Sequence, residues 1–338
     1  FPLKLARVFR GAHKDDLAYT CVQRAKMQLI IIIFGAVLGL TYGAYYDGFI
    51  FRSKICLFAG LPLILPSLFK VKFSDVNLLW PYRVVIIKSI FLNYLLLPVF
   101  ALSIGLLTQD FGIAAGLFLL SVLSGGGMVM HWIDKSGADT SLGFLLLFIN
   151  LLFVSLSLLM LHTFGIYTSE YFDTSYVDET NVSHFAKAVL MLLIVVPFLA
   201  SRILLFIKPV VSLIEKYRSY ISSISIFVII VYLFGLQNSQ QLFDLYDFEP
   251  ELIYISAITV SVYYLLSLID SRLIFDLSSE QERVAFWHSV TRYITLALVI
   301  STFTTYTFGV SMRLPIMLAY VIQIPFAIFI DKQLRVKK

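Results

Sequence analysis

Long apolar stretches alternate with short polar connections along almost the whole chain. A helix that crosses a bilayer needs about 20 mostly apolar residues, and ten stretches reach or approach this length. The second stretch is short and contains Pro62 and Pro66, so the pattern defines its limits least well. The predicted spans are 27–46, 55–69, 81–107, 112–133, 140–166, 185–207, 219–236, 252–275, 287–309 and 312–331.

Composition supports the same class of protein. Hydrophobic residues make up 59% of the 338 positions and charged residues 14%, and the mean hydropathy is +0.88. A water-soluble protein could not form both a core and a hydrated surface from this mixture. The sequence therefore predicts an all-α polytopic membrane protein. Its first partner is the lipid bilayer, and its expected location is the cell (inner) membrane.

Lysine and arginine collect at alternate ends of the predicted spans. Short loops rich in these residues stay cytoplasmic, so their positions give the orientation. Basic residues crowd the leader before the first span and the tail after the tenth, while the opposite side carries the acidic connections 169–180 and 243–251. Both termini are therefore predicted to be cytoplasmic. The formal charge of +5 follows from this topology and requires no nucleic-acid partner.

An acidic linker divides the ten predicted spans into five and five. An odd number of spans in each half gives the halves opposite orientations, which is the arrangement of an inverted repeat. The predicted units are a cytoplasmic basic leader (1–26), a first five-helix repeat (27–166), an extracytoplasmic acidic linker (167–184), a second five-helix repeat (185–331) and a cytoplasmic basic tail (332–338).

Three consecutive glycines, Gly125 to Gly127, fall inside the predicted fourth span. Each glycine costs a helix interior about 1 kcal/mol relative to alanine, so the run predicts a break. Broken backbone at bilayer depth is tolerated where it lies inside protein or lines a wet cavity, and many secondary transporters bind their solute at such breaks. Close helix packing through small residues is the alternative. The predicted ninth span has a polar cluster at 301–305, so we expect a midplane site between the halves.

Polar side chains near these clusters are the candidate solute-binding groups. His131 is the only histidine that the pattern places clearly in the membrane core, although a hydrogen bond near the cytoplasmic interface is its alternative role. Hydroxyl groups in membrane helices often bond to their own backbone, and buried amides often join helices. The candidate substrate-binding residues are Asn93, Ser124, Gly125, Gly126, Gly127, Met128, His131, Asn150, Ser301, Thr302 and Thr305.

The remaining polar residues suggest little further chemistry. Lys88 and Arg292 lie near the predicted cytoplasmic edge, where we expect their side chains to extend to the membrane surface. Cys21 and Cys56 are expected on opposite faces, so the sequence predicts neither a disulfide nor a metal site. We find no motif for catalysis or for a cofactor, which argues against an enzyme.

Several segments together resemble one group of transporters. They are LILPSLFKVKFSDV at 63–76, Asn93 placed five residues before Pro98, GGGMVMHWIDKSGAD at 125–139, Asn150, the segment 292–302 and VIQIPFAIF at 321–329. Their order and spacing resemble the bile acid, arsenite and riboflavin transporter superfamily, especially the arsenical-resistance-3 arsenite exporters and the bile acid sodium symporters. The resemblance covers most of the chain. It implies ten helices, a panel domain, a core domain, and crossed discontinuous helices four and nine.

The positions that carry chemistry in those families hold other residues here. The exporter cysteine that binds arsenic corresponds to Gly125, and the sodium-binding Ser-Asn pair of the symporters corresponds to Val129 and Met130. The other replaced positions are Ala297 for the ninth-helix glutamate, or Thr295 in the exporter alignment, Ser301 for the following glutamine, and Gln323 for the tenth-helix glutamate of the exporters.

Carboxylates are also missing around both clusters. None lies between Asp110 and Asp134, and none between Glu282 and Asp331. Sodium needs oxygen ligands and usually an anionic one, and a proton relay needs a titratable group at depth. We therefore expect the family coupling site to be degenerate.

Three functions fit these observations. The first is a secondary transporter or facilitator that moves a small solute, expected to be an anion, by alternating access where helices four and nine cross. The second is a membrane sensor or anchor that has kept the fold without turnover, as part of a larger protein, since the chain begins at Phe1 and further residues are expected upstream. The third is an arsenite exporter with relocated ligands. A homodimer and a fused or associated signalling domain stay open as partners.

Overall fold

The computed structural model describes residues 30–46, 48–49, 79–126, 129–176, 195–235 and 251–336, with isolated positions at 62, 65, 68, 69, 77 and 191. Within these ranges the regular elements are helices, which confirms the all-α class. They are the helix Ile30–Tyr46, α3 (Arg83–Phe91), η2 (Leu92–Leu96), α4 (Leu97–Leu106), α5 (Phe111–Val122), α6 (Val129–Ser136), α7 (Thr140–Leu152), α8 (Val154–Thr168), η3 (Glu170–Phe172), α10 (Val196–Leu204), α11 (Lys208–Lys216), α12 (Arg218–Gly235), α14 (Glu251–Ile274), α15 (Glu280–Val290), α16 (Ile294–Phe303), α17 (Thr305–Phe308), η5 (Val310–Met312) and α18 (Arg313–Val336).

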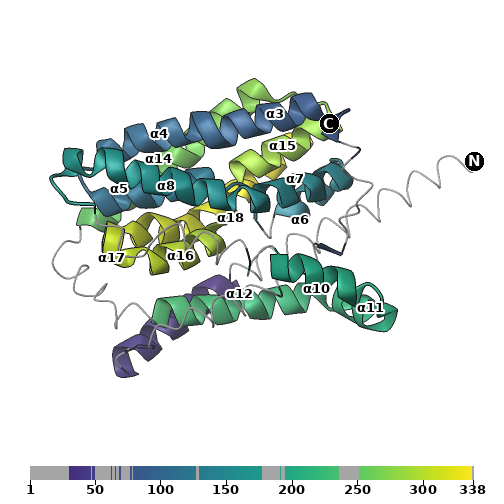
Figure 1. Ribbon diagram of the computed structural model, residues 1–338, viewed down its shortest axis with the longest axis horizontal. Helices are drawn as coiled ribbons and strands as arrows, with labels where there is room; N and C mark the ends of the chain where they lie inside the picture. Colours follow the sequence, from purple (N-terminus) through teal and green to yellow (C-terminus); the bar gives the residue numbers. More distant parts are fainter. Residues whose placement is uncertain are drawn as a thin grey trace, which may run out of the picture.

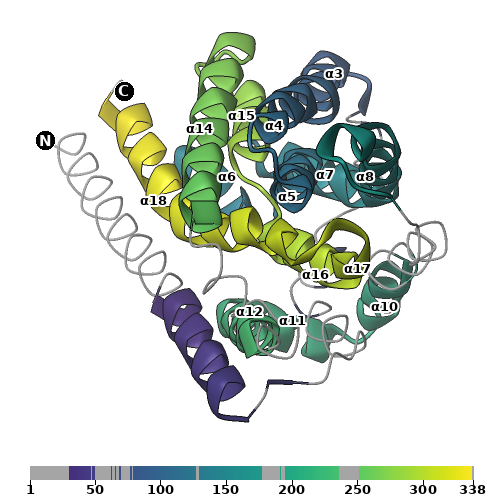
Figure 2. The ribbon, with the colours of Figure 1, turned by 90° about the vertical axis from the view of Figure 1, so that its left-hand side faces the viewer.

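The helices form two groups (Figure 1). The helix Ile30–Tyr46 lies with α10, α11 and α12 along one side, and we call this group the panel. The other helices form a larger bundle, the core, in which α16 and α17 lie on the side that faces α12 (Figure 2). Helix α5 runs through the centre of the core, and every residue from Gly112 to Val122 is buried.

Within the described ranges, three helices are long and apolar enough to cross a membrane by themselves: Arg83–Leu106, Glu251–Ile274 and Val310–Leu334. Two bent pairs raise this number to five if each pair is one span: α7 with α8, bent by 44°, and α10 with α11, bent by 114°. The chain is thus a multi-pass membrane protein. The predicted second span, 55–69, falls largely outside the described residues, so the ten-span topology and the cytoplasmic termini stay predictions.

A proline shapes the first long helix. Pro98 has no N–H group to donate to the carbonyl four residues earlier, so the hydrogen-bond ladder must shift where it enters the helix. The shift appears as the π-helical turn η2, which directly precedes α4 and contains Asn93. Because of this extra residue in the turn, Asn93 faces the interior and is fully buried.

Two of the breaks in the core helices lie side by side. The first break separates α5 from α6, where the glycine run predicted it. The second separates α15 from α16 at residues 291–293. Here the predicted ninth span, 287–309, is wrong at its start, because Ser279 caps a helix that begins at Glu280. The break therefore lies well before the polar cluster at 301–305.

Candidate functional site

The two breaks pair with each other in the middle of the core. Ser124 and Arg292 form an isolated antiparallel bridge, and the Tyr293 N–H donates to the Leu123 carbonyl at 3.0 Å. The Gly125 N–H lies 3.1 Å from the His288 carbonyl and 2.9 Å from the Thr291 carbonyl. Two short extended segments thus replace helical hydrogen bonds with bonds across the crossing.

Glycine is required at this crossing for two reasons. Gly125 has φ +75° and Gly126 has φ +140°, conformations that side chains with a Cβ atom rarely adopt. A Cβ atom on Gly125 would also lie 2.7 Å from Nδ1 of His288. The predicted break is therefore present, and the close packing of the alternative interpretation is present as well, because the glycines open the helix and also admit the second chain segment.

A buried polar network supports the first break. Asn150 on α7 donates from Nδ2 to Ser124 Oγ at 2.9 Å and lies 3.1 Å from Nδ1 of His288. The other ring nitrogen, Nε2, lies 3.2 Å from the Gly143 carbonyl. These partners assign the proton to Nε2, because Nδ1 faces a donor and Nε2 faces an acceptor. His288 is fully buried, so the expectation that His131 is the only histidine in the core is wrong.

Arg292 lies in the interior, with a side chain only 2% exposed. Its guanidinium donates to Asn93 Oδ1 and to the Ser121 carbonyl, each at 3.0 Å, and to the Ser289 carbonyl. The expectation that this side chain extends to the membrane surface is therefore wrong. It failed because the second break lies deeper in the protein than the predicted start of the ninth span implied.

Lys88 also differs from expectation. Its ammonium group pairs with the Glu282 carboxylate at 2.8 Å and does not simply extend into solvent. The pair joins α3 to the first turn of α15, and the Lys88 side chain is 37% exposed. This partial exposure makes the bridge a minor contribution to stability.

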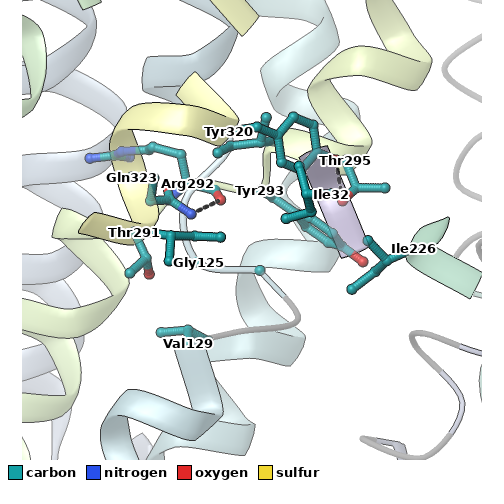
Figure 3. Close-up of a pocket in the computed structure, with 13 residues that line it drawn as sticks. Ile32, Gly125, Val129, Ile226, Thr291, Arg292, Tyr293, Thr295, Tyr320 and Gln323 are labelled. Atoms are coloured by element: carbon teal, nitrogen blue, oxygen red, sulfur yellow. Dashed lines mark hydrogen bonds between the residues drawn. The ribbon is translucent and has the colours of Figure 1, made fainter. Parts of the chain in front are cut away.

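Gln323 on α18 completes the pairing of the second break. Its Oε1 accepts from the Arg292 N–H at 2.6 Å and from the Tyr264 hydroxyl at 2.7 Å, and its Nε2 donates to the Arg292 carbonyl at 3.3 Å. The amide thus bonds to both backbone groups of Arg292, as a neighbouring strand would (Figure 3). An ionised glutamate at position 323 could not donate a hydrogen bond to the Arg292 carbonyl.

A pocket lies against the crossing, between the core and the panel (Figure 3). Its cavity volume is about 50 Å³, and it opens in part to the outside. Ile32 and Ile226 form its wall on the panel side, opposite the two breaks. The residues that line it are Ile32, Gly125, Gly126, Val129, Ile226, Thr291, Arg292, Tyr293, Ile294, Thr295, Tyr320, Gln323 and Ile324.

Two half-helices begin at this pocket. Val129 is the first residue of α6, and Ile294 is the first of α16. The residue before α16, Tyr293, makes no side-chain capping hydrogen bond in the described part of the chain. N–H groups in the first turn of a helix have no partner within the helix, and the helix dipole places partial positive charge there. The pocket therefore has a positive electrostatic bias from two directions.

The predicted site residues are divided by the structure into three groups. Gly125 and Gly126 line the pocket. Asn93, Ser124 and Asn150 form the polar network behind the crossing, where they join helices. Ser301 lies apart from the crossing. Its hydroxyl donates to the backbone carbonyl of Leu298 at 2.8 Å, which agrees with the alternative that hydroxyls of membrane helices bond to their own backbone. Outside the described residues or side chains are Gly127, Met128, His131, Thr302 and Thr305, and also Cys21 and Cys56.

Sequence reasoning missed most of the pocket wall. Residues 291–295 line it because the second break is there, and the capping serine at the start of α15 was the signal that could have located this break. Ile32 and Ile226 carry no signal, because an apolar residue of a membrane helix can face lipid, protein or a pocket. Tyr320 was likewise unmarked, although its hydroxyl donates to Thr295 Oγ1 at 2.7 Å beside the pocket.

A family model matches the chain over the first break. The model of the Sodium Bile acid symporter family matches residues 55–243, which is more than half of the chain. The matched segment contains the first break and the panel helices α10 to α12, and it ends before α14. No curated protein matches the chain.

Proposed function

The chain belongs to the sodium bile acid symporter family, and from this premise we propose that it is a secondary transporter or facilitator that carries a small organic anion through the pocket at the crossing. Membership in the family assigns the chain to solute transporters in general. Our proposal goes beyond family membership in three respects: the solute is an anion, the coupling site is degenerate, and transport occurs by alternating access. The pocket at the two half-helix N-termini is the observation that carries it.

The electrostatics of the pocket favour an anion. Helix N-termini attract negative charge by about 0.3–1 kcal/mol each at exposed sites, and more where water is excluded. None of the described lining residues carries a carboxylate that would repel an anion. The Tyr320 and Thr295 hydroxyls and the Gly125 and Gly126 backbone add polar groups, and four isoleucines with Val129 supply much of the apolar lining. This combination suits a carboxylate or similar group on an apolar body.

Alternating access is supported by the position of the pocket. Its two walls belong to separate groups of helices, the panel and the core. Contacts between these groups include apolar and aromatic pairs, such as Phe148 on α7 and Phe198 on α10, whose ring centroids are 5.6 Å apart. Apolar contacts have little directional preference, so the panel can move against the core at a low cost in free energy. This movement would expose the pocket to each side of the membrane in turn.

Coupling to a cation has little support at the positions that the family resemblance indicates. Ala297 is fully buried and apolar, and Gln323 uses its amide to hold the Arg292 backbone. We therefore propose transport that does not require a sodium or proton gradient. Arsenite is disfavoured because no described lining residue carries sulfur, the soft ligand that trivalent arsenic prefers.

The test is uptake of labelled mono- and dicarboxylates into sealed proteoliposomes, with and without sodium and pH gradients. Ile226→Trp should abolish uptake, because the indole fills the pocket from the panel side. Ile224→Trp is the matched control, since residue 224 lies on the same helix and is 63% exposed. Equal uptake by both variants would exclude the pocket as the route. Carboxylate binding without any flux would favour the sensor or anchor function instead.

A further inference from the structure

Two negative helix ends meet at the crossing, on the side away from the pocket. Helix α5 ends at Val122 and α15 ends at Val290. The last carbonyls of each helix have no partner within the helix, and the dipole gives each end about half a negative charge. Two such ends inside a protein repel each other, so a cation between them would stabilise the crossing.

The guanidinium of Arg292 lies between these two ends. It donates at 3.0 Å to the Ser121 carbonyl, in the last turn of α5, and also to the Ser289 carbonyl, in the last turn of α15. The third oxygen is Oδ1 of Asn93, at 3.0 Å from the π-helical turn. The ring of Tyr263 on α14 lies 5.7 Å from the guanidinium carbon and adds a cation–π contact.

This buried charge has no carboxylate partner among the described residues. The two ion pairs found there join Lys88 to Glu282 and Lys135 to Asp331, and neither involves Arg292. Burying an uncompensated cation would cost several kcal/mol. The compensation comes from neutral oxygens and helix ends, which is the kind of oxygen set that holds a bare monovalent cation in channels and transporters.

We propose that the Arg292 guanidinium is a tethered cation, which occupies a cation site formed by the ends of α5 and α15 and by Asn93. Because the charge is covalently attached, the crossing is held together without a bound monovalent ion. Removing the side chain should leave an oxygen-lined cavity that binds a free cation. Resting on the proposed function, the same charge explains how transport can proceed without a cation gradient.

Chemical rescue tests the site without knowledge of the solute. Arg292→Ala in detergent should melt several degrees below the wild type, and guanidinium at millimolar concentration should restore at least half of this loss with saturation. Tetramethylammonium is the control, because it has the charge without N–H donors and should restore nothing. The wild type should show no shift with guanidinium. Loss of stability that guanidinium does not restore would overturn the proposal.

A second pair of variants decides the question if Arg292→Ala does not fold. Arg292→Lys keeps a cation of similar reach, whereas Arg292→Met keeps a similar shape without charge. The lysine variant should melt several degrees above the methionine variant. Equal melting temperatures would mean that the volume of the side chain, and not its charge, stabilises the site. This result would overturn the proposal of a tethered cation. These readouts need no transport, so their failure is distinct from a failure of the proposed function.

Discussion

Gly125→Ala adds a single methyl group, yet we expect it to lower the stability of the crossing strongly. The φ of +75° costs a residue with a Cβ atom about 1–2 kcal/mol. The new methyl group would also lie 2.7 Å from Nδ1 of His288. The two ring nitrogens of this histidine already contact Asn150 and the Gly143 carbonyl, which limits its movement. Overpacking of a tight interior costs a further amount of about 1–3 kcal/mol. The sum predicts a loss of about 2–5 kcal/mol in the free energy of unfolding.

Gly137→Ala separates the two parts of this loss. Gly137 has φ +68°, but a Cβ atom there would meet nothing within 4 Å. This control should therefore lose only the conformational part, about 1–2 kcal/mol. The difference between the two variants measures the overlap with His288.

The assay is thermal unfolding in detergent, followed by intrinsic fluorescence, for both single variants and for Gly125→Ala combined with His288→Ala. Removing the imidazole should relieve the overlap, so the double variant should lose less stability than the sum of the single variants. Additive losses, or a Gly125→Ala variant as stable as Gly137→Ala, would refute the packing of His288 against this glycine.

Other variants test the elements around the crossing. Gln323→Leu leaves three groups without their partner, among them both backbone groups of Arg292, and should cost about 2–5 kcal/mol of unfolding free energy. Gln333→Leu on the same helix removes a bond to an exposed arginine and should cost less than about 1 kcal/mol by the same thermal assay. Asp331→Asn leaves the buried Lys135 without its partner at 2.7 Å and should cost about 3–5 kcal/mol, whereas the double variant with Lys135→Met should recover most of this in denaturation curves.

The first break was predictable because its signal is local. Three glycines in an apolar stretch have few explanations, and the structure breaks the helix between Val122 and Val129. Asn93 was also marked by sequence, as a polar residue inside an apolar stretch five residues before Pro98.

The family resemblance implied a discontinuous ninth helix, but the residue pattern placed its polar interruption too late, because hydropathy and capping disagree at this helix. The segment that begins α15 is polar, so an apolar window starts the span at 287, two turns too late. Ser279 with Glu282 forms the Ser-x-x-Glu pattern of a helix start, and the Ser279 hydroxyl accepts from the Glu282 N–H at 3.3 Å. Reading this cap first would have started the helix at Glu280 and so placed His288 two turns inside it.

The pocket wall on the panel side could not have been predicted from one sequence. Ile32 and Ile226 are 194 positions apart and lie in helices that are apolar on several faces. Which face meets the core depends on tertiary packing, because lipid and protein are equally apolar neighbours. Gln323 illustrates the same limit, since its bonds to the Arg292 backbone exist only after the two breaks have crossed.

Thiol labelling can show whether a water-accessible pocket of positive potential lies between panel and core. With Cys21 and Cys56 replaced by serine, Ile226→Cys should react with charged methanethiosulfonates, while Ile224→Cys, which is 63% exposed on the membrane surface of the same helix, should not. Relative to the exposed loop variant Ser175→Cys, position 226 should react with the anionic reagent about 3–30-fold faster, the equivalent of two helix N-termini at about 0.3–1 kcal/mol each, and correspondingly slower with the cationic reagent. A position 226 that is unreactive, or that prefers the cationic reagent, would contradict the account.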